Sequence, residues 1–162
     1  MEKCYVLFGS NMGDKNQIFA QACLLINNRC HIEAVSSAYE SEPWGFEAKE
    51  WFLNRLIIVE TELEPEEMMR QLLDIEAELG RVRHPEVEGY TSRTADLDIL
   101  YYGSRIVLTD NLTIPHPRLH ERRFALLPLC EMVPQLVHPA FNFTQTELLR
   151  RCHDFSEVRK IE

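Results

Sequence analysis

The hydrophobic positions near the start of the chain predict a strand followed by a helix. Apolar residues run from Cys4 to Phe8 and stop at Gly9, which is typical of a short strand. Beyond Asp14 the spacing changes to that of one helical face, with apolar residues at Phe19, Cys23 and Ile26. The turn between these elements, Gly9 to Asp14, could hold a phosphate on its backbone N–H groups, but we expect it to be structural, with Asn11 or Asp14 as the helix cap.

The following stretch predicts two strands joined by a loop. Ile32 to Tyr39 is strand-like, and Phe52 to Thr61 is β-branched and apolar, which favours strands. Between them, Glu40 to Glu50 contains Pro43 and Gly45. We therefore expect a loop here, of a length that often carries function.

A second helix is the clearest element in the pattern. Pro65 suits its first turn, Gly80 stands where its C-terminal cap belongs, and an apolar stripe lies between them at Met68, Leu72, Ile75 and Leu79. No apolar period continues from Arg81 to Arg93, where Pro85 and Gly89 interrupt the run. This segment is predicted to be a mobile loop.

The second half of the chain predicts one more long strand and further helices. Ala95 to Tyr102 is strand-like, and Tyr102 to Arg105 resembles the turn of a hairpin that leads into Ile106 to Leu108. Leu119 to Met132 favours a helix that Pro128 interrupts.

A last short helix is expected around Leu148. The element order β-α-β-β-α-β, with additional pieces, is the split pattern of a ferredoxin-like α+β sandwich. Such a sandwich has a mainly antiparallel sheet with helices packed on it. The length of 162 residues favours one domain over residues 1–162.

Composition and charge exclude several classes of protein. The chain has 17 Lys and Arg against 26 Asp and Glu, a net charge of −9, which opposes a broad nucleic-acid-binding surface. No apolar run approaches the length of a membrane helix, and no secretory signal is visible. The five cysteines are widely spaced and form no CxxC pair, which favours reduced thiols. We expect a cytoplasmic protein.

The basic residues are concentrated in one window, from Arg81 to Arg123. Seven arginines and no lysine stand there against six acidic residues, so the acidic excess lies elsewhere in the chain. Each arginine could be a surface residue paired with a nearby glutamate. Because arginine presents a planar fork of donors that suits phosphate, the cluster as a whole favours an anion site.

Asp96 and Asp98 are the strongest candidates for chemistry within this window. Two residues apart on a predicted strand, their side chains point to the same face, roughly 7 Å apart. Such a pair could simply belong to a solvated face. Three arginines precede it, however, at Arg81, Arg83 and Arg93. Hard carboxylate ligands beside arginines are typical of a metal-phosphate site that holds one or two Mg²⁺.

Aromatic residues near the predicted loops suggest a slot for a flat heterocycle. They are Trp44, Trp51, Phe52 and Phe124, and the small polar residues Ser41 and Asn54 are near two of them. Core packing is the alternative. His116, between two prolines, could reach a phosphate or be a structural residue. Neither a Walker A loop nor a GxGxxG fingerprint is present.

Six segments of the chain, taken in order, read FGSNMGD, SSAYESEPWGF, FLNRLIIVET, IEAELGRVR, SRTADLDILYYG and LTIPHPRLHERRFALLPL. Together they resemble the 6-hydroxymethyl-7,8-dihydropterin pyrophosphokinase family of folate biosynthesis. The resemblance runs from about Gly9 to Pro134, and the combination of GRxR, RTxDLDIL and IPHPRxxxRxF carries its specificity. It implies a ferredoxin-like fold and transfer of pyrophosphate from ATP to the pterin, which releases AMP.

The resemblance also implies roles for individual residues. Asp96 and Asp98 would bind two Mg²⁺ ions, and Arg81 and Arg93 would steady the transferring phosphates, assisted by Arg83. Nucleotide-binding positions would be Glu76, Ile99, His116 and Arg122. Phe52 and Phe124 would enclose the pterin ring, while its polar edge would be read by Ser41, the backbone at Trp44, and Asn54. A monomer that acts on these small molecules is expected.

Two regions depart from the family pattern. The loop from His84 to Ser92 lacks a Trp-Gly-Pro-Arg sequence that many relatives carry, so Tyr90 is the candidate for its closing aromatic residue. Glu42 and Trp44 differ from the usual residues at the rim of the pterin pocket. An RNA-binding module and a metal-dependent phosphohydrolase are the alternatives, and pterin-dependent AMP release separates all three.

Overall fold

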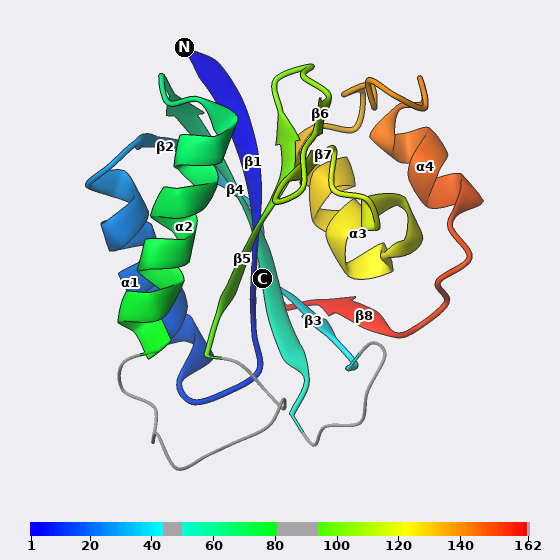
Figure 1. The fold of residues 1–162 in the computed structure, drawn as a ribbon. Helices are drawn as coiled ribbons and strands as arrows, with labels where there is room; N and C mark the ends of the chain where they lie inside the picture. Colours follow the sequence, from blue (N-terminus) through cyan, green and yellow to red (C-terminus); the bar gives the residue numbers. More distant parts are fainter. Residues whose placement is uncertain (44–49, 81–93, 162) are drawn as a thin grey trace.

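The computed structural model describes residues 1–43, 50–80 and 94–161. Within these ranges the chain forms a six-stranded sheet in which every paired strand is antiparallel, and a separate two-stranded ribbon. Figure 1 shows α1 and α2 against one face of the sheet and α3 and α4 on the other. The predicted α+β sandwich is confirmed. Trp44 and the segment from Arg81 to Arg93 lie outside the described residues.

Two long strands form the centre of the sheet. β1 (Glu2–Ser10) pairs along its whole length with β4 (Phe52–Thr61). The strand order is β5-β1-β4-β3-β8, and β2 also pairs with β4. The bounds of the other strands are Asp96–Tyr102 for β5, Tyr39–Ser41 for β3, His31–Val35 for β2 and Val158–Lys160 for β8.

The first layer of helices packs on one face of this sheet. α1 (Lys15–Asn27) begins as predicted, because the Asp14 carboxylate accepts a hydrogen bond of 3.2 Å from the N–H of Gln17. α2 (Pro65–Gly80) buries the predicted stripe, which confirms the clearest element of the pattern. The core between these helices and the sheet contains Val6, Phe8, Phe19, Ile26, Ile57, Leu72 and Ile75.

The second layer covers the opposite face. A single 3₁₀ turn (Leu119–Glu121) precedes α3 (Arg123–Met132), and α4 (Gln145–Arg151) follows. The expectation that Pro128 would interrupt the helix is wrong. Pro128 is buried inside α3, where it forgoes one backbone hydrogen bond, and packing of that face into the second core offsets the loss. This core contains Leu7, Leu56, Leu100, Tyr101, Leu119, Leu126, Leu129 and Leu148.

The predicted strand from Ile32 to Tyr39 is interrupted at Ser36. The N–H of Ser36 donates to the carbonyl of Leu56 at 2.9 Å, while the Ser36 hydroxyl oxygen accepts from the N–H of Leu56 at 2.9 Å. The Ser36 hydroxyl thus takes the place of a backbone acceptor in the pairing with β4, and this break separates β2 from β3. As a result Ser41 lies in a strand, whereas the sequence predicted a loop from Glu40 onward.

The predicted hairpin after β5 is also different. β6 (Val107–Leu108) pairs with β7 (Thr113–Ile114), and the two strands form the separate ribbon. Gly103 has a positive φ of 56°, and its N–H donates to the carbonyl of Lys3 at 2.7 Å. This turn directs the chain away from the sheet edge, so the segment after it finds its partner further along the sequence.

A β-bulge interrupts the register between β1 and β5. Tyr5 pairs with Tyr101, but Val6 pairs with Ile99, which leaves Leu100 as an additional residue on β5. Leu100 and Tyr101 therefore both pack into the second core. Below the bulge the alternation is shifted by one residue. Leu97 and Ile99 face the first core, and Asp98 and Asp96 pair with Leu7 and Gly9.

Candidate active site

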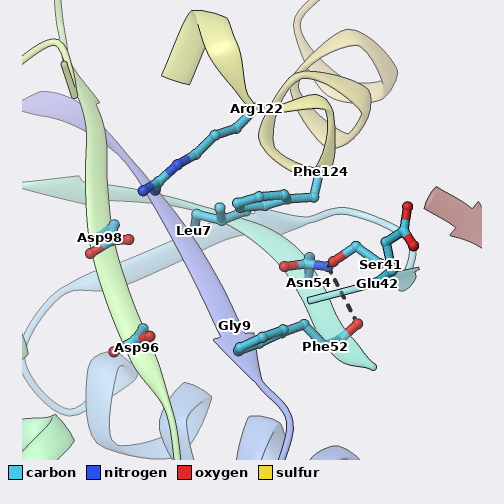
Figure 2. Close-up of a pocket in the computed structure, with 10 residues that line it drawn as sticks. All are labelled: Leu7, Gly9, Ser41, Glu42, Phe52, Asn54, Asp96, Asp98, Arg122 and Phe124. Atoms are coloured by element: carbon cyan, nitrogen blue, oxygen red, sulfur yellow. Dashed lines mark hydrogen bonds between the residues drawn. The ribbon is translucent and has the colours of Figure 1, made fainter. Parts of the chain in front are cut away.

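A row of cross-strand neighbours runs across one end of the sheet. Asp96 on β5 pairs with Gly9 on β1, Gly9 with Asn54 on β4, and Asn54 with Tyr39 on β3. Directly paired residues project to the same face of a sheet. The first cavity lies on this face, with residues of four strands and of the start of α3 around it (Figure 2): Leu7, Gly9, Ser41, Glu42, Phe52, Asn54, Asp96, Asp98, Arg122 and Phe124.

Asn54 forms the polar floor of the first cavity. Its side chain is 2% exposed, and its amide nitrogen lies 2.8 Å from the hydroxyl oxygen of Ser41, 3.3 Å from the carbonyl of Tyr39 and 3.4 Å from that of Phe52. The protein therefore supplies acceptors for this nitrogen. With the nitrogen fixed, the side-chain carbonyl of Asn54 is held on the side of Gly9, and Figure 2 shows it directed into the cavity.

Two phenylalanines supply the apolar walls. Phe52 begins β4 and Phe124 lies in the first turn of α3, and Figure 2 shows their rings on opposite sides of the first cavity. Both are partly exposed, which distinguishes them from core aromatics. The guanidinium of Arg122 lies 5.6 Å from the centroid of the Phe124 ring. A flat ring would therefore find apolar surfaces above and below it and polar groups at its edge.

A second cavity lies on the α2 side of β5. It is lined by α2, β5 and the segment around β7: Met69, Leu72, Leu73, Glu76, Asp96, Leu97, Asp98, Ile99, Asp110, Asn111, Leu112, Thr113, His116 and Pro117. Asp96 and Asp98 line this cavity as well as the first one. Because β5 is an edge strand, its side chains can be reached from both sides. The two aspartates stand where the cavities meet.

The electrostatics of this junction combine two carboxylates with a half-buried cation. Arg122 extends toward Asp98 in Figure 2. Burial lowers the pKa of Arg122, while the charge of Asp98 acts in the opposite direction. Among the described residues, no group of three or more His, Cys, Asp and Glu could hold a metal ion. The donor set is thus one pair of carboxylates. It fits Mg²⁺, which commonly binds one or two carboxylates together with substrate phosphates and water.

A hydrogen bond from α2 to β5 fixes the position of the carboxylate pair, Asp96 and Asp98. A carboxylate oxygen of Glu76 on α2 accepts a hydrogen bond of 2.6 Å from the N–H of Leu97. The next core residue of the strand, Ile99, is buried and also lines the second cavity. Glu76 therefore has a structural contact in addition to its predicted place beside a nucleotide.

His116 lines the second cavity as a neutral imidazole. Burial lowers its pKa to about 4, and the charges of Arg122 and Arg118 act in the same direction. Its Nδ1 accepts a hydrogen bond of 3.1 Å from the N–H of Arg118, so Nε2 carries the proton. The residue can donate a hydrogen bond to a ligand from Nε2, but it supplies no positive charge near neutral pH.

The structure brings together most of the residues that the sequence singled out. Ten of the fourteen predicted site residues lie around the two cavities: Ser41, Phe52, Asn54, Glu76, Asp96, Asp98, Ile99, His116, Arg122 and Phe124. Trp44, Arg81, Arg83 and Arg93 lie outside the described residues. Leu7 and Gly9 also line the first cavity, although neither was among the predicted site residues. Their period-two spacing in β1 was a usable signal, because it matches that of Asp98 and Asp96 on the neighbouring strand.

Three comparisons identify relatives of this chain. A family model described as 7,8-dihydro-6-hydroxymethylpterin-pyrophosphokinase (HPPK) matches residues 5–134. The 2-amino-4-hydroxy-6-hydroxymethyldihydropteridine pyrophosphokinase of Bacillus subtilis is 41% identical over 82% of this chain and 78% of its own length. The Aquifex aeolicus protein of the same name is 36% identical over 87% of this chain and 86% of its own length.

Other relatives are much longer than this chain. The folic acid synthesis protein FOL1 of Dictyostelium discoideum is 37% identical over 89% of this chain, which spans 22% of that protein. A solved HPPK-DHPS structure from Plasmodium falciparum covers 93% of this chain with a TM-score of 0.76 and 17% identity. This chain spans 44% of it, and the likeness concerns the fold alone. By the family model and by identity over most of its length, the chain belongs to the 7,8-dihydro-6-hydroxymethylpterin-pyrophosphokinase family.

Proposed function

We propose that Asp96 and Asp98 mark the point at which this enzyme transfers pyrophosphate. The chain acts as a 2-amino-4-hydroxy-6-hydroxymethyldihydropteridine pyrophosphokinase in folate biosynthesis, with ATP as co-substrate, and yields AMP and the pterin diphosphate. The observation that carries the proposed site is that both aspartates line both cavities. One substrate can occupy each cavity, with the reacting groups meeting between them.

The first cavity would hold the pterin. Phe52 and Phe124 would enclose the flat ring, and the Asn54 carbonyl and the Ser41 hydroxyl would meet the polar edge of the ring. The backbone at Trp44 would complete this edge. Since the Asn54 nitrogen already has acceptors in the protein, the residue would recognise donor groups of the pterin. This preorganisation lowers the entropic cost of binding.

The second cavity would hold ATP. Ile99 offers an apolar surface for the base, Glu76 lies beside it, and His116 would donate from Nε2 to an oxygen of the nucleotide. Arg122 extends toward the carboxylate pair, where the triphosphate would run. Arg81, Arg83 and Arg93 would complete the phosphate contacts, as the family resemblance implies. Arginine forks suit the several oxygens of a transferring phosphate.

The two carboxylates would hold the metal, which we propose to be two Mg²⁺ ions. Bound Mg²⁺ neutralises charge on the phosphates and makes the attacking hydroxyl more acidic. The contribution of the chain itself is positioning. The first cavity directs the hydroxymethyl group toward Asp96 and Asp98, and the second directs the phosphates toward the same point. Alignment of two reactants can supply about 7 to 11 kcal/mol of the barrier reduction.

We also propose that residues 1–162 form a single domain that works as a cytoplasmic monomer. Both cores share one sheet, and the two cavities meet at a single strand of it, β5. All five cysteines are free thiols, which fits a reducing compartment. Of the helices in the described ranges, none has the length and apolar character needed to span a bilayer.

The decisive experiment measures AMP formation. ATP and Mg²⁺ are supplied with and without 6-hydroxymethyl-7,8-dihydropterin, and products are separated by anion-exchange chromatography. We expect AMP and pterin diphosphate in equal amounts, and only when the pterin is present. Release of inorganic phosphate from ATP without the pterin would instead indicate a phosphohydrolase. Comparison of the wild type with the Asp96→Asn variant in the same assay shows whether the activity depends on the point where the two cavities meet.

A further inference from the structure

The last strand of the sheet, β8, lies against the rim of the first cavity. It pairs with β3 at the edge opposite β5, with Val158 opposite Ser41 and Arg159 opposite Glu40. β8 falls outside residues 5–134, the part of the chain that the family model matches. Resting on the proposed pterin site, we infer that β8 and the residue before it, Glu157, position the pterin-binding rim.

Glu157 holds the rim residue Glu42 at two points. The N–H of Glu42 donates to the carbonyl of Glu157 at 3.3 Å, and the N–H of Glu157 donates to the Glu42 carboxylate at 2.8 Å. Glu42 lines the first cavity, and Figure 2 shows its side chain turned toward the outer edge of the sheet, where β8 runs in faint red. The backbone and the side chain of one cavity residue are therefore both fixed by the segment that leads into β8.

A second contact joins β8 to the other side of the rim. The guanidinium of Arg159 lies 4.4 Å from the centre of the Trp51 ring, and it is 3.5 Å from the carboxylate of Glu157. Trp51 directly precedes Phe52, one wall of the cavity. A cation above an aromatic face is attracted to it, so Arg159 holds the strand entry next to that wall.

The contacts of β3 carry this positioning to the cavity floor. Ser41 is 2% exposed, and its hydroxyl oxygen accepts the hydrogen bond of 2.8 Å from Asn54. Without β8, the outer edge of β3 would have no partner strand. A shift of β3 would then move the Ser41 oxygen and break its hydrogen bond to the side-chain nitrogen of Asn54. The geometry of the polar edge thus depends on a strand that has no residue in the cavity.

β8 itself contributes little to the stability of the fold. Among the residues of the two hydrophobic cores, none belongs to β8, and Arg159 and Lys160 are exposed. Short edge strands with few buried apolar contacts open most easily. Loss of β8 should therefore act locally on the rim, while the opposite sheet edge, with β5 and the nucleotide cavity, keeps its packing.

The test compares three variants with the wild type. Glu157→Pro removes the N–H that donates to Glu42 and keeps the carbonyl that accepts from it. Lys160→Ala removes an exposed side chain of the same strand that takes part in none of these contacts, and it is the matched control. Deletion of residues 157–162 removes the whole strand. For each protein, KM for the pterin and kcat are measured by AMP release, the Kd for a non-hydrolysable ATP analogue by calorimetry, and Tm by circular dichroism.

We expect the pterin KM of Glu157→Pro and of the deletion variant to rise at least tenfold. Their kcat and nucleotide Kd should stay within about threefold of wild type, and Lys160→Ala should match wild type. An unchanged pterin KM in Glu157→Pro, or an equal loss of pterin and nucleotide binding, would overturn the inference. If the deletion variant does not fold, the proline variant decides. A wild-type protein that releases no pterin-dependent AMP would instead contradict the proposed function.

Discussion

The Glu76 carboxylate accepts a 2.6 Å hydrogen bond from the backbone N–H of Leu97, the residue between the two site aspartates. This contact ties α2 to β5 at the point where the two cavities meet. Groups that orient metal ligands without touching the metal commonly affect activity by 10- to 100-fold. Glu76 is therefore expected to act on the carboxylate pair through the backbone.

We predict that Glu76→Ala lowers kcat by roughly 10- to 100-fold and raises the Mg²⁺ concentration needed for half-maximal rate. Glu76→Gln keeps an acceptor oxygen for Leu97 and should retain most of the activity. Glu78→Ala, which removes a carboxylate paired with Arg29 at 2.8 Å on the same helix, is the control. Steady-state AMP release over a Mg²⁺ titration measures the effect. Equal Mg²⁺ dependence in Glu76→Ala and wild type would refute it.

Replacement of either site aspartate should remove the activity and preserve the fold. Asp96→Asn and Asp98→Asn each take away one proposed metal ligand at a partly exposed position, and we expect kcat to fall by about 10³-fold or more. The exposed Asp74→Asn on α2 serves as the control for loss of a carboxylate. Thermal unfolding should give similar Tm values for all of these proteins. Near-normal turnover in either site variant would contradict the metal assignment.

A methyl group at Gly9 should block the pterin without disturbing the strand. A Cβ added at Gly9 would lie 3.7 Å from the side-chain oxygen of Asn54, which is an ordinary contact distance, so the backbone can accept it. The methyl would occupy the floor of the first cavity. We predict that Gly9→Ala raises the pterin KM by about tenfold and leaves the Kd for the ATP analogue unchanged. Equal pterin binding in both proteins would show that the ring lies elsewhere.

The stability of the fold should fall in acid through buried histidines. Burial lowers the pKa of His138 to about 4, and the charge of His120 acts in the same direction. The unfolded chain binds this proton near pH 6.5, so between pH 6.5 and pH 4 it holds more protons than the folded chain. The free energy of unfolding therefore decreases as pH falls through this window.

His138→Asn tests this dependence. The Nδ1 of His138 accepts from the N–H groups of Ala140 at 3.1 Å and Phe141 at 3.0 Å, and an asparagine oxygen can take over that role. The variant should be less stable at pH 7 by about 1 to 3 kcal/mol, because it loses the stacking on Phe141. Its unfolding free energy, from urea titrations at several pH values, should fall less steeply between pH 6.5 and 4. The exposed His31→Asn variant should keep the wild-type slope.

The sequence predicted the elements whose periodicity is repeated several times. β4 begins and ends where the pattern placed it, α2 begins at the predicted Pro65, and the capping role of Asp14 follows from its chemistry. The pairing of Asp96 and Asp98 on one face also followed from the period of a strand. The family and its α+β fold, predicted from combined motifs, are confirmed by the comparisons and by the sheet.

Features that depend on distant partners could not be predicted in the same way. The break at Ser36 depends on a hydrogen bond to Leu56, and the ribbon of β6 and β7 depends on how the chain leaves the sheet. Strand β8 has three residues and no apolar alternation, so it forms a strand because of its pairing with β3, which the sequence does not reveal. The roles proposed for the individual site residues, including Arg81 and Arg93, stay predictions that the variants above can test.

The additional residue on β5 determines which way the two carboxylates face. Counting back from Tyr102 with strict alternation, Asp98 would point toward the core beneath α1 and α2. The bulge at Leu100 reverses this, so that Asp96 and Asp98 face the first cavity. If β5 kept all of its residues but paired with β1 without the bulge, every side chain below Leu100 would therefore turn to the other face. Two negative charges would be presented to the hydrocarbon interior and Leu97 and Ile99 to water, so the reactive face of the enzyme depends on this one irregularity of strand pairing.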